Sequence, residues 1–175
     1  MRPRKKLAIA LTFFALLSAA PRPATAQQKG DFLTDAEADK IRDAERNLSL
    51  KIKLYVDFAD DRLAKFKYTL AHPNEDRKRD EILNGLLNDY GSCIDAAADL
   101  IDVAKQHQQD IRPGLKSLQS KGKDFLAYLQ ELSKDGSELG TYKMNLDDAI
   151  EATQDAMDSA QKALKEIQAP VRRKQ

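Results

Sequence analysis

The chain has 175 residues, of which 29 are basic, 28 are acidic, two are histidine and one is cysteine. This length is sufficient for one domain with a hydrophobic core, and a single cysteine excludes an intramolecular disulfide framework. Charges of both signs alternate along the sequence instead of forming a basic surface, so we do not expect nucleic-acid binding.

The first 26 residues contain the three parts of a secretory signal peptide. Basic residues at positions 2–6 precede an apolar run over 7–20, and the small-residue cleavage site Ala24-Thr25-Ala26 follows. The run is shorter than the roughly 20 residues that a membrane-spanning helix needs. We therefore expect an exported protein, periplasmic or secreted, whose mature form begins at Gln27 and has no membrane span. Five basic residues leave with the signal peptide, so the mature chain carries 24 basic and 28 acidic residues.

The pattern of the remaining residues predicts helices that are interrupted at a few points. Proline occurs after the signal peptide only at Pro73, Pro113 and Pro170, and each lies where a helical pattern ends or restarts. We expect a short N-terminal segment over 27–33, a single domain over 34–169 and a basic tail over 170–175. The predicted class is all-α, an antiparallel up-down bundle of four long helices joined by short connections.

The first predicted helix covers residues 34–71. Thr34 and Glu37 form a capping box at its start, and apolar residues then recur at steps of three and four from Ile41 to Leu70. The segment 48–54 also alternates like a half-buried strand. Because the rest of the chain offers no partner strand, we interpret this segment as helical.

The helical interpretation places Leu50, Leu54 and Phe58 on one ridge, four residues apart. This ridge lies outside the main apolar stripe and widens the apolar arc beyond the ~100° that packing on one core requires. Two explanations follow. Either the ridge binds a protein partner or a second copy of the chain, or the helix sits deep enough for its own bundle to cover the ridge.

The second predicted helix begins after an N-cap at Asn74 and ends before Pro113. Its apolar face includes Cys93. The side chain of Cys93 has two interpretations, a buried small apolar group or one half of an intermolecular disulfide.

Pro113 suits the first turn of a third helix, and residues 134–140 look like a turn before a fourth helix that runs from Leu139 toward Pro170. The heptad positions from Leu118 to Ile167 nevertheless stay in phase through this turn. One continuous helix from Pro113 to Pro170, within a three-helix bundle, is therefore the alternative.

No recognisable catalytic, metal or haem motif occurs in the sequence, and we expect neither a cofactor nor enzymatic activity. His72 and His107 lie near opposite ends of the second predicted helix, too far apart to share a metal ion. The many carboxylates mostly fall off the apolar stripes and alternate with basic residues, as expected of a solvated helix face.

The sequence thus favours an exported, non-enzymatic helical bundle that acts through protein–protein contacts, as an envelope interaction module, a scaffold or a chaperone-like protein. The alternative is a periplasmic bundle that binds a small ligand or a metal in a cavity. Gly85, Gly91 and Gly122 would make room for such a cavity.

Overall fold

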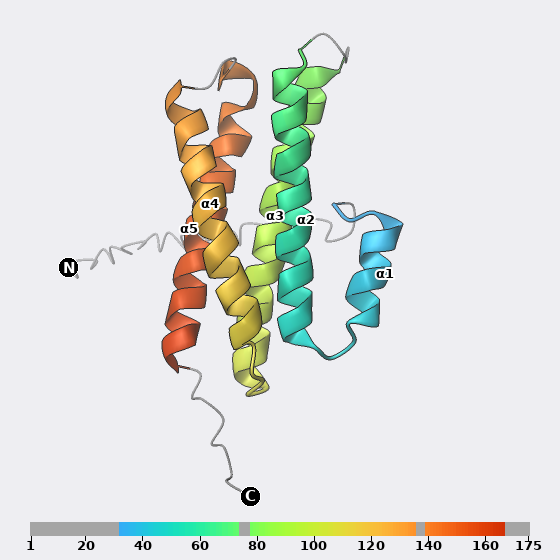
Figure 1. Ribbon diagram of the computed structural model, residues 1–175, viewed down its shortest axis with the longest axis vertical. Helices are drawn as coiled ribbons and strands as arrows, with labels where there is room; N and C mark the ends of the chain where they lie inside the picture. The colour runs from blue at the N-terminus through green and yellow to red at the C-terminus, as the bar shows by residue number, and fades with distance from the viewer. Residues whose placement is uncertain (1–31, 74–77, 136–138, 167–175) are drawn as a thin grey trace, which may run out of the picture.

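The computed structural model describes residues 32–73, 78–135 and 139–166. Five helices form this part of the chain: α1 (Asp35–Asp43), α2 (Leu48–Ala71), α3 (Arg79–Gln106), α4 (Arg112–Asp135) and α5 (Leu139–Glu166). Helices α2 to α5 are long and form a bundle, and the short α1 lies beside α2 (Figure 1). The prediction of an all-α helical bundle is confirmed, with one helix more than expected.

The four long helices pack in a ring. The packed pairs are α2 with α3, α3 with α5, α5 with α4, and α4 with α2. Consecutive helices run in opposite directions, as predicted, and the connection between α3 and α4 crosses the bundle diagonally (Figure 1). Because α4 and α5 pack against each other, the alternative of one continuous helix through residues 134–140 is wrong.

The predicted first helix is in fact two helices. Helix α1 ends at Asp43 and α2 begins at Leu48, and α1 folds back along α2 (Figure 1). The capping box of Thr34 and Glu37 is present as predicted. Asn47 caps the start of α2, because its side chain accepts a hydrogen bond of 2.9 Å from the backbone N–H of Leu50. The apolar periodicity runs through this turn and therefore does not reveal it.

Several other boundaries agree with the sequence. Pro113 lies in the first turn of α4, α5 begins at Leu139, and His107 caps the C-terminal end of α3. Arg79 joins α2 to α3, since its buried guanidinium donates to the backbone carbonyls of Thr69 and Leu70. The predicted signal peptide, the Asn74 cap and the C-terminal tail lie outside the described residues.

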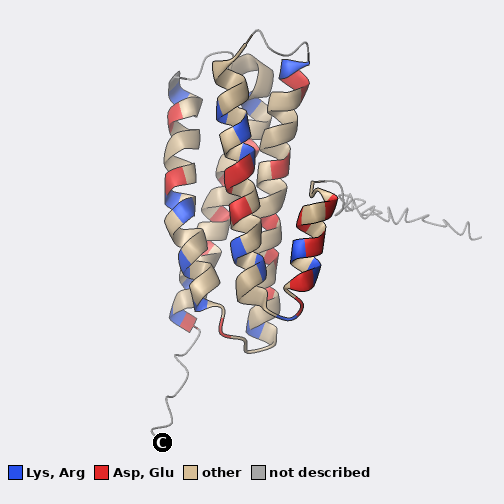
Figure 2. Ribbon diagram, turned by 45° about the vertical axis from the view of Figure 1, so that its right-hand side comes forward, with Lys and Arg blue, Asp and Glu red and all other residues tan. Residues whose placement is uncertain are grey.

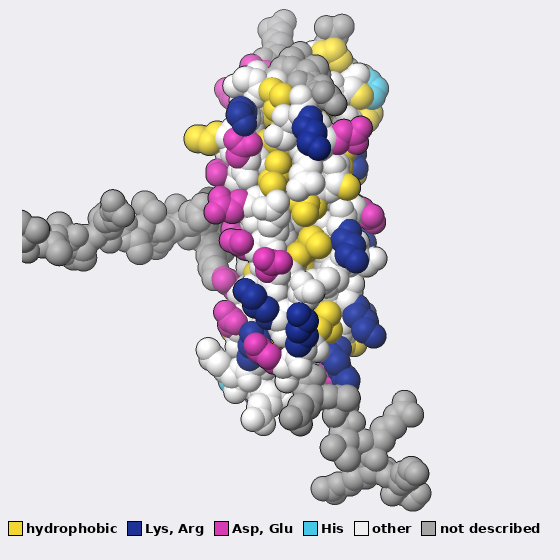
Figure 3. Space-filling model, turned by 90° about the vertical axis from the view of Figure 1, so that its left-hand side faces the viewer, with side chains coloured by type: hydrophobic (Ala, Val, Ile, Leu, Met, Phe, Trp, Pro, Cys, Tyr) yellow, Lys and Arg dark blue, Asp and Glu magenta, His cyan; other side chains and the backbone are white. Residues whose placement is uncertain are grey.

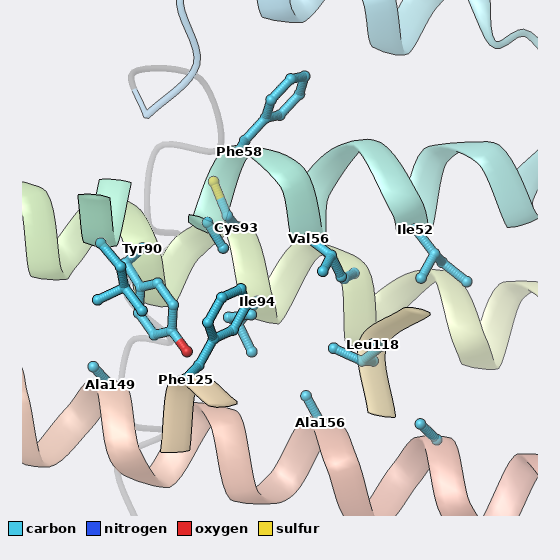
Figure 4. Packing of buried hydrophobic residues seen from close by; sticks show 14 of the residues in the cluster. Ile52, Val56, Phe58, Tyr90, Cys93, Ile94, Leu118, Phe125, Ala149 and Ala156 are labelled. Atoms are coloured by element: carbon cyan, nitrogen blue, oxygen red, sulfur yellow. The ribbon is translucent and has the colours of Figure 1, made fainter. Parts of the chain in front are cut away.

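The core lies between the four long helices. Tyr90 of α3 packs edge-on against Phe125 of α4, and its hydroxyl is 2.6 Å from that of Thr153 of α5. Cys93 is fully buried, which confirms its interpretation as a small core side chain. Figure 4 shows Val56 and Ile52 of α2 pointing into this core.

Replacement of Gly114 and of Gly85 by alanine is expected to change the free energy of unfolding in opposite directions. A Cβ atom at Gly114 would lie 2.8 Å from the backbone oxygen of Ser49, so Gly114→Ala is expected to destabilise the protein by about 1–3 kcal/mol. A Cβ atom at Gly85 would meet nothing within 4 Å, so Gly85→Ala should stabilise it by about 0.5–1 kcal/mol through helix propensity. Urea unfolding of the two variants measures both values. Equal effects of the two changes would contradict the close packing of α4 on α2.

Candidate functional site

The ridge of Leu50, Leu54 and Phe58 lies on the side of α2 that faces α1. Phe58 is only 6 % exposed and points away from the four-helix core, toward α1 (Figure 4). Leu54 is half-buried, and Leu50 is 41 % exposed. The structure thus separates the three residues: the chain itself covers Phe58 and part of Leu54, whereas Leu50 remains open to solvent.

The cover is the N-terminal part of the described chain. The ring of Phe32 lies tilted against that of Tyr55, with centroids 6.4 Å apart, and Tyr55 in turn meets Phe58 edge-on at 6.3 Å. Leu33 and Ile41 also pack against the apolar surface. Helix α1 contributes few apolar contacts of its own, because six of its nine residues are charged and none is fully buried (Figure 2).

An ion pair adds to the few apolar contacts that hold α1 against α2. Arg62 follows Phe58 by four residues and so continues the same ridge. Its guanidinium donates two hydrogen bonds to the carboxylate of Glu37 on α1, at 2.8 and 2.6 Å, and a third of 3.0 Å to the carbonyl of Phe32. The side chains of Arg62 and Glu37 are 5 % and 12 % exposed. This bidentate and largely buried ion pair fixes the orientation of α1 on α2.

The electrostatics of the pair favour its ionised form. Burial by itself raises the pKa of Glu37, but hydrogen bonds from Arg62 and Thr34 outweigh this effect and lower the pKa to about 2. The hydrogen bonds to Glu37 raise the pKa of Arg62 in return. Both groups are therefore charged at neutral pH. Loss of Arg62 would leave the Glu37 carboxylate with only its hydrogen bonds from Thr34, and loss of Glu37 would leave Arg62 with Asp61 and the Phe32 carbonyl. Each loss removes the main partner of a largely buried charge, which is costly.

Two titratable groups of α3 are coupled electrostatically to this pair. Burial raises the pKa of Asp89, against the opposing effect of the Arg62 charge. Burial likewise raises the pKa of the Cys93 thiol to about 12, although Arg62 acts in the other direction. Cys93 is therefore a neutral thiol at physiological pH, without the nucleophilic character of a thiolate.

The turn between α1 and α2 completes the site. It spans the four residues from Ala44 to Asn47, and Glu45 has a φ of 43°, in the left-handed region that non-glycine residues seldom adopt. Ala44 is buried against the bundle. The hairpin of α1 and α2 is therefore held by the contacts of α1, by the Asn47 cap and by the burial of Ala44, and it is disfavoured by the backbone conformation of Glu45.

The sequence pattern predicts the ridge but does not indicate Arg62 and Glu37 as its partners. The pattern around Glu37 predicts only the capping box, whereas in the structure Glu37 also pairs with Arg62, and one of its oxygens accepts from the backbone N–H of Thr34 at 2.8 Å. The four-residue spacing from Leu50 through Leu54 and Phe58 leads directly to Arg62. A charged residue in line with an apolar ridge is the signal that could have indicated a buried pair.

A second feature is a hollow of about 200 Å³ between α3 and α5. Gly91 lines it, together with polar side chains that include Asp95 and Asn145, whereas Gly122 packs tightly against Met157 and makes no room. The hollow is smaller than the roughly 300–1,000 Å³ of typical ligand pockets. Burial and the neighbouring carboxylates Asp99 and Asp155 raise the pKa of Asp95.

The bundle has another apolar surface besides the ridge. Figure 3 shows a line of hydrophobic side chains on the face formed by α4 and α5, between acidic and basic side chains. Nothing in the described chain covers that line. The α2 ridge differs because α1 already lies on it and shows which kind of segment it binds.

The residues that the structure describes show neither a metal-ligand cluster nor a membrane-spanning helix. Within residues 32–73, 78–135 and 139–166, no three His, Cys, Asp or Glu side chains come together as metal ligands. None of the helices in these ranges has the length and apolar character needed to cross a bilayer. His72 and His107 each lie at the C-terminal end of a helix, at opposite ends of the bundle.

Comparison of the chain with protein-family models, with curated proteins and with solved structures gave no match.

Proposed function

We propose that the protein is an exported, non-enzymatic helical bundle that acts through protein–protein contacts, and that the surface of α2 beneath α1 binds a helical segment. We call this surface the α2 docking surface; it consists of Leu54, Tyr55, Phe58 and Arg62. The signal-peptide sequence supports export. The seating of α1 on this surface supports helix binding.

The main support for this proposal is the bidentate contact between Arg62 and Glu37 beneath a short, mostly charged helix. A nine-residue helix is not stable alone in water, so α1 depends on the α2 docking surface for its structure. The surface in turn recognises two features, an acidic side chain at the position of Glu37 and an aromatic ring beside Tyr55. A helix that offers both can bind in the same way.

A labelled peptide of residues 31–46 tests whether the surface accepts a helix from outside. The wild-type chain presents its own α1 at a high effective concentration, so the peptide is added to the full-length variant Glu37→Arg, whose α1 is repelled by Arg62. We expect saturable binding by fluorescence anisotropy. The matched control is a peptide that carries Glu37→Arg, which should fail to bind this variant and should bind the variant Arg62→Glu. Equal binding of the two peptides to both variants would refute the proposed surface.

Export is tested at the N-terminus. Expression of the full chain in a host with a secretory pathway should yield, outside the cytoplasm, a protein whose first residue is Gln27. N-terminal sequencing or intact mass determines the residue. Recovery from that fraction of a chain that still begins at Met1 would contradict cleavage, and a chain confined to the cytoplasm would contradict export.

A further inference from the structure

We infer that the segment bound by the α2 docking surface in an assembly is α1 of a second copy, so that two chains exchange their α1 helices. The inference rests on the proposed function, because it requires the surface to accept a helix from another molecule. Three features of the chain point to this occupant: the turn at 44–47, the apolar pattern through that turn, and the pairing of Arg62 with Glu37.

One residue of the turn between α1 and α2 disfavours the closed hairpin. Glu45 adopts a left-handed conformation at φ 43°, which is unfavourable for a residue with a side chain. Ala44, Glu45 and Arg46 favour α-helix over turn conformations, whereas Asn47, the fourth residue, caps α2 in the closed form. Opening the turn removes the strain at Glu45 and extends the helix.

The sequence supports the open form. Apolar residues keep helical spacing from Ile41 through Leu48 and Ile52, so residues 35–71 can form one continuous helix. In that form α1 projects beyond the end of the bundle, and the α2 docking surface is uncovered. The open form therefore exposes both the binding segment and the surface that binds it.

In a pair of open chains, α1 of each chain can bind the α2 docking surface of the other. Glu37 of one chain can meet Arg62 of the other, and the reciprocal pair forms by two-fold symmetry. Each surface then regains the contacts that the closed monomer makes, including the ring contact of Phe32 with Tyr55. Asp61 and Asp89, the other carboxylates near Arg62, belong to the same chain as Arg62 in both forms. Exchange thus relieves the strain at Glu45 in two turns. Its cost is the loss of two Asn47 caps and the association of two molecules.

Charge reversal gives a direct test with full-length protein. The variant Glu37→Arg places two arginines at the site, and the variant Arg62→Glu places two glutamates there. Neither variant can close its own hairpin or exchange with itself. In an equal mixture, the Glu37→Arg side chain of one chain meets the Arg62→Glu side chain of the other, while the native pair forms at the second surface. We expect light scattering to show monomers for each variant alone and a heterodimer for the mixture.

Variants of the turn provide matched controls in the wild-type background. Glu45→Gly removes the strain of the closed turn and disfavours the continuous helix, so it should lower the dimer association constant by about tenfold. Asn47→Ala removes the cap of α2 and should raise that constant. Both changes leave the docking surface itself intact.

The possible outcomes separate the two proposals. A monomeric mixture would overturn exchange. If the double variant Glu37→Arg/Arg62→Glu then restores amide protection of α1 within one chain, the α2 docking surface stands and only its occupant is wrong. If the double variant fails as well, the docking surface is also wrong. A wild-type dimer that persists in both single variants would show association through another surface and would likewise overturn exchange.

Discussion

Replacement of Arg62 by methionine is expected to release α1 while the four long helices stay folded. The change leaves the Glu37 carboxylate against an apolar surface without its partner, and breaking a buried pair in this way costs about 3–5 kcal/mol. Helix α1 packs on α2 and has no fully buried side chain, so its detachment avoids this cost. Hydrogen exchange should show loss of protection at Asp35–Asp43 and retention at Arg79–Gln106.

The matched control for this variant is Arg42→Met. Arg42 also belongs to an arginine–carboxylate pair at 2.6 Å, with Asp39, but its side chain is 75 % exposed and the pair lies within α1. Exposed pairs contribute little to stability, so protection of α1 should stay close to that of the wild type. Equal loss of protection in both variants would mean that charge on α1, rather than the buried pair, holds the helix.

Replacement of Phe66 by alanine is expected to cost the most stability of any change considered, about 3–5 kcal/mol. Phe66 of α2 is fully buried and meets the ring of Tyr142 edge-on, with ring centroids 5.3 Å apart. Its removal leaves a cavity between two of the long helices. The free energy of unfolding from urea titration measures the loss, which should appear in the whole bundle at once.

Phe58→Ala is the matched change on the other side of α2. Phe58 is also buried, but beneath α1 instead of within the four-helix core (Figure 4). We expect this variant to lose protection at α1 and to change the melting of the bundle much less than Phe66→Ala. If the two variants destabilise the bundle equally, α1 belongs to the same cooperative unit as the long helices.

Much of the fold follows from the sequence because each signal has a local physical cause. The capping box at Thr34 starts α1, and Pro113 fits the first turn of α4 because its missing N–H costs nothing there. The burial of Cys93 follows from its place beside an apolar stripe. The break before Leu139 was indicated by turn residues, although the heptad pattern continues through it.

The hairpin of α1 and α2 could not be predicted in the same way. Its turn has no glycine or proline, and the strained residue is a glutamate whose propensity favours helix. The Asn47 cap stabilises the turn locally, and the contact between Glu37 and Arg62, which are 25 residues apart, holds α1 against α2. Local patterns do not report such a tertiary contact. The ridge can be predicted because its residues are close together in the sequence. The segment that covers it cannot, because it contacts the ridge only in the folded chain.

Acid should release α1 before it unfolds the bundle. The pKa of Glu37 is about 2 when α1 is docked and 4.5 as the ordinary value, so docking disfavours protonation. The stabilisation that this gives is complete above pH 4.5 and is lost as the pH falls toward 2. Arg62→Met serves as the reference, because it keeps the other nearby carboxylates, Asp61 and Asp89, and lacks the pair.

The most direct test is therefore the protection of α1 amides, relative to those of α3, as a function of pH in the wild type and in Arg62→Met. If the buried pair holds α1, wild-type protection at Asp35–Asp43 falls below pH 4.5 while protection of α3 persists, and the variant shows no protection of α1 at any pH. Protection of α1 that is unaffected by Arg62→Met, or that is lost only together with protection of α3, would contradict the account.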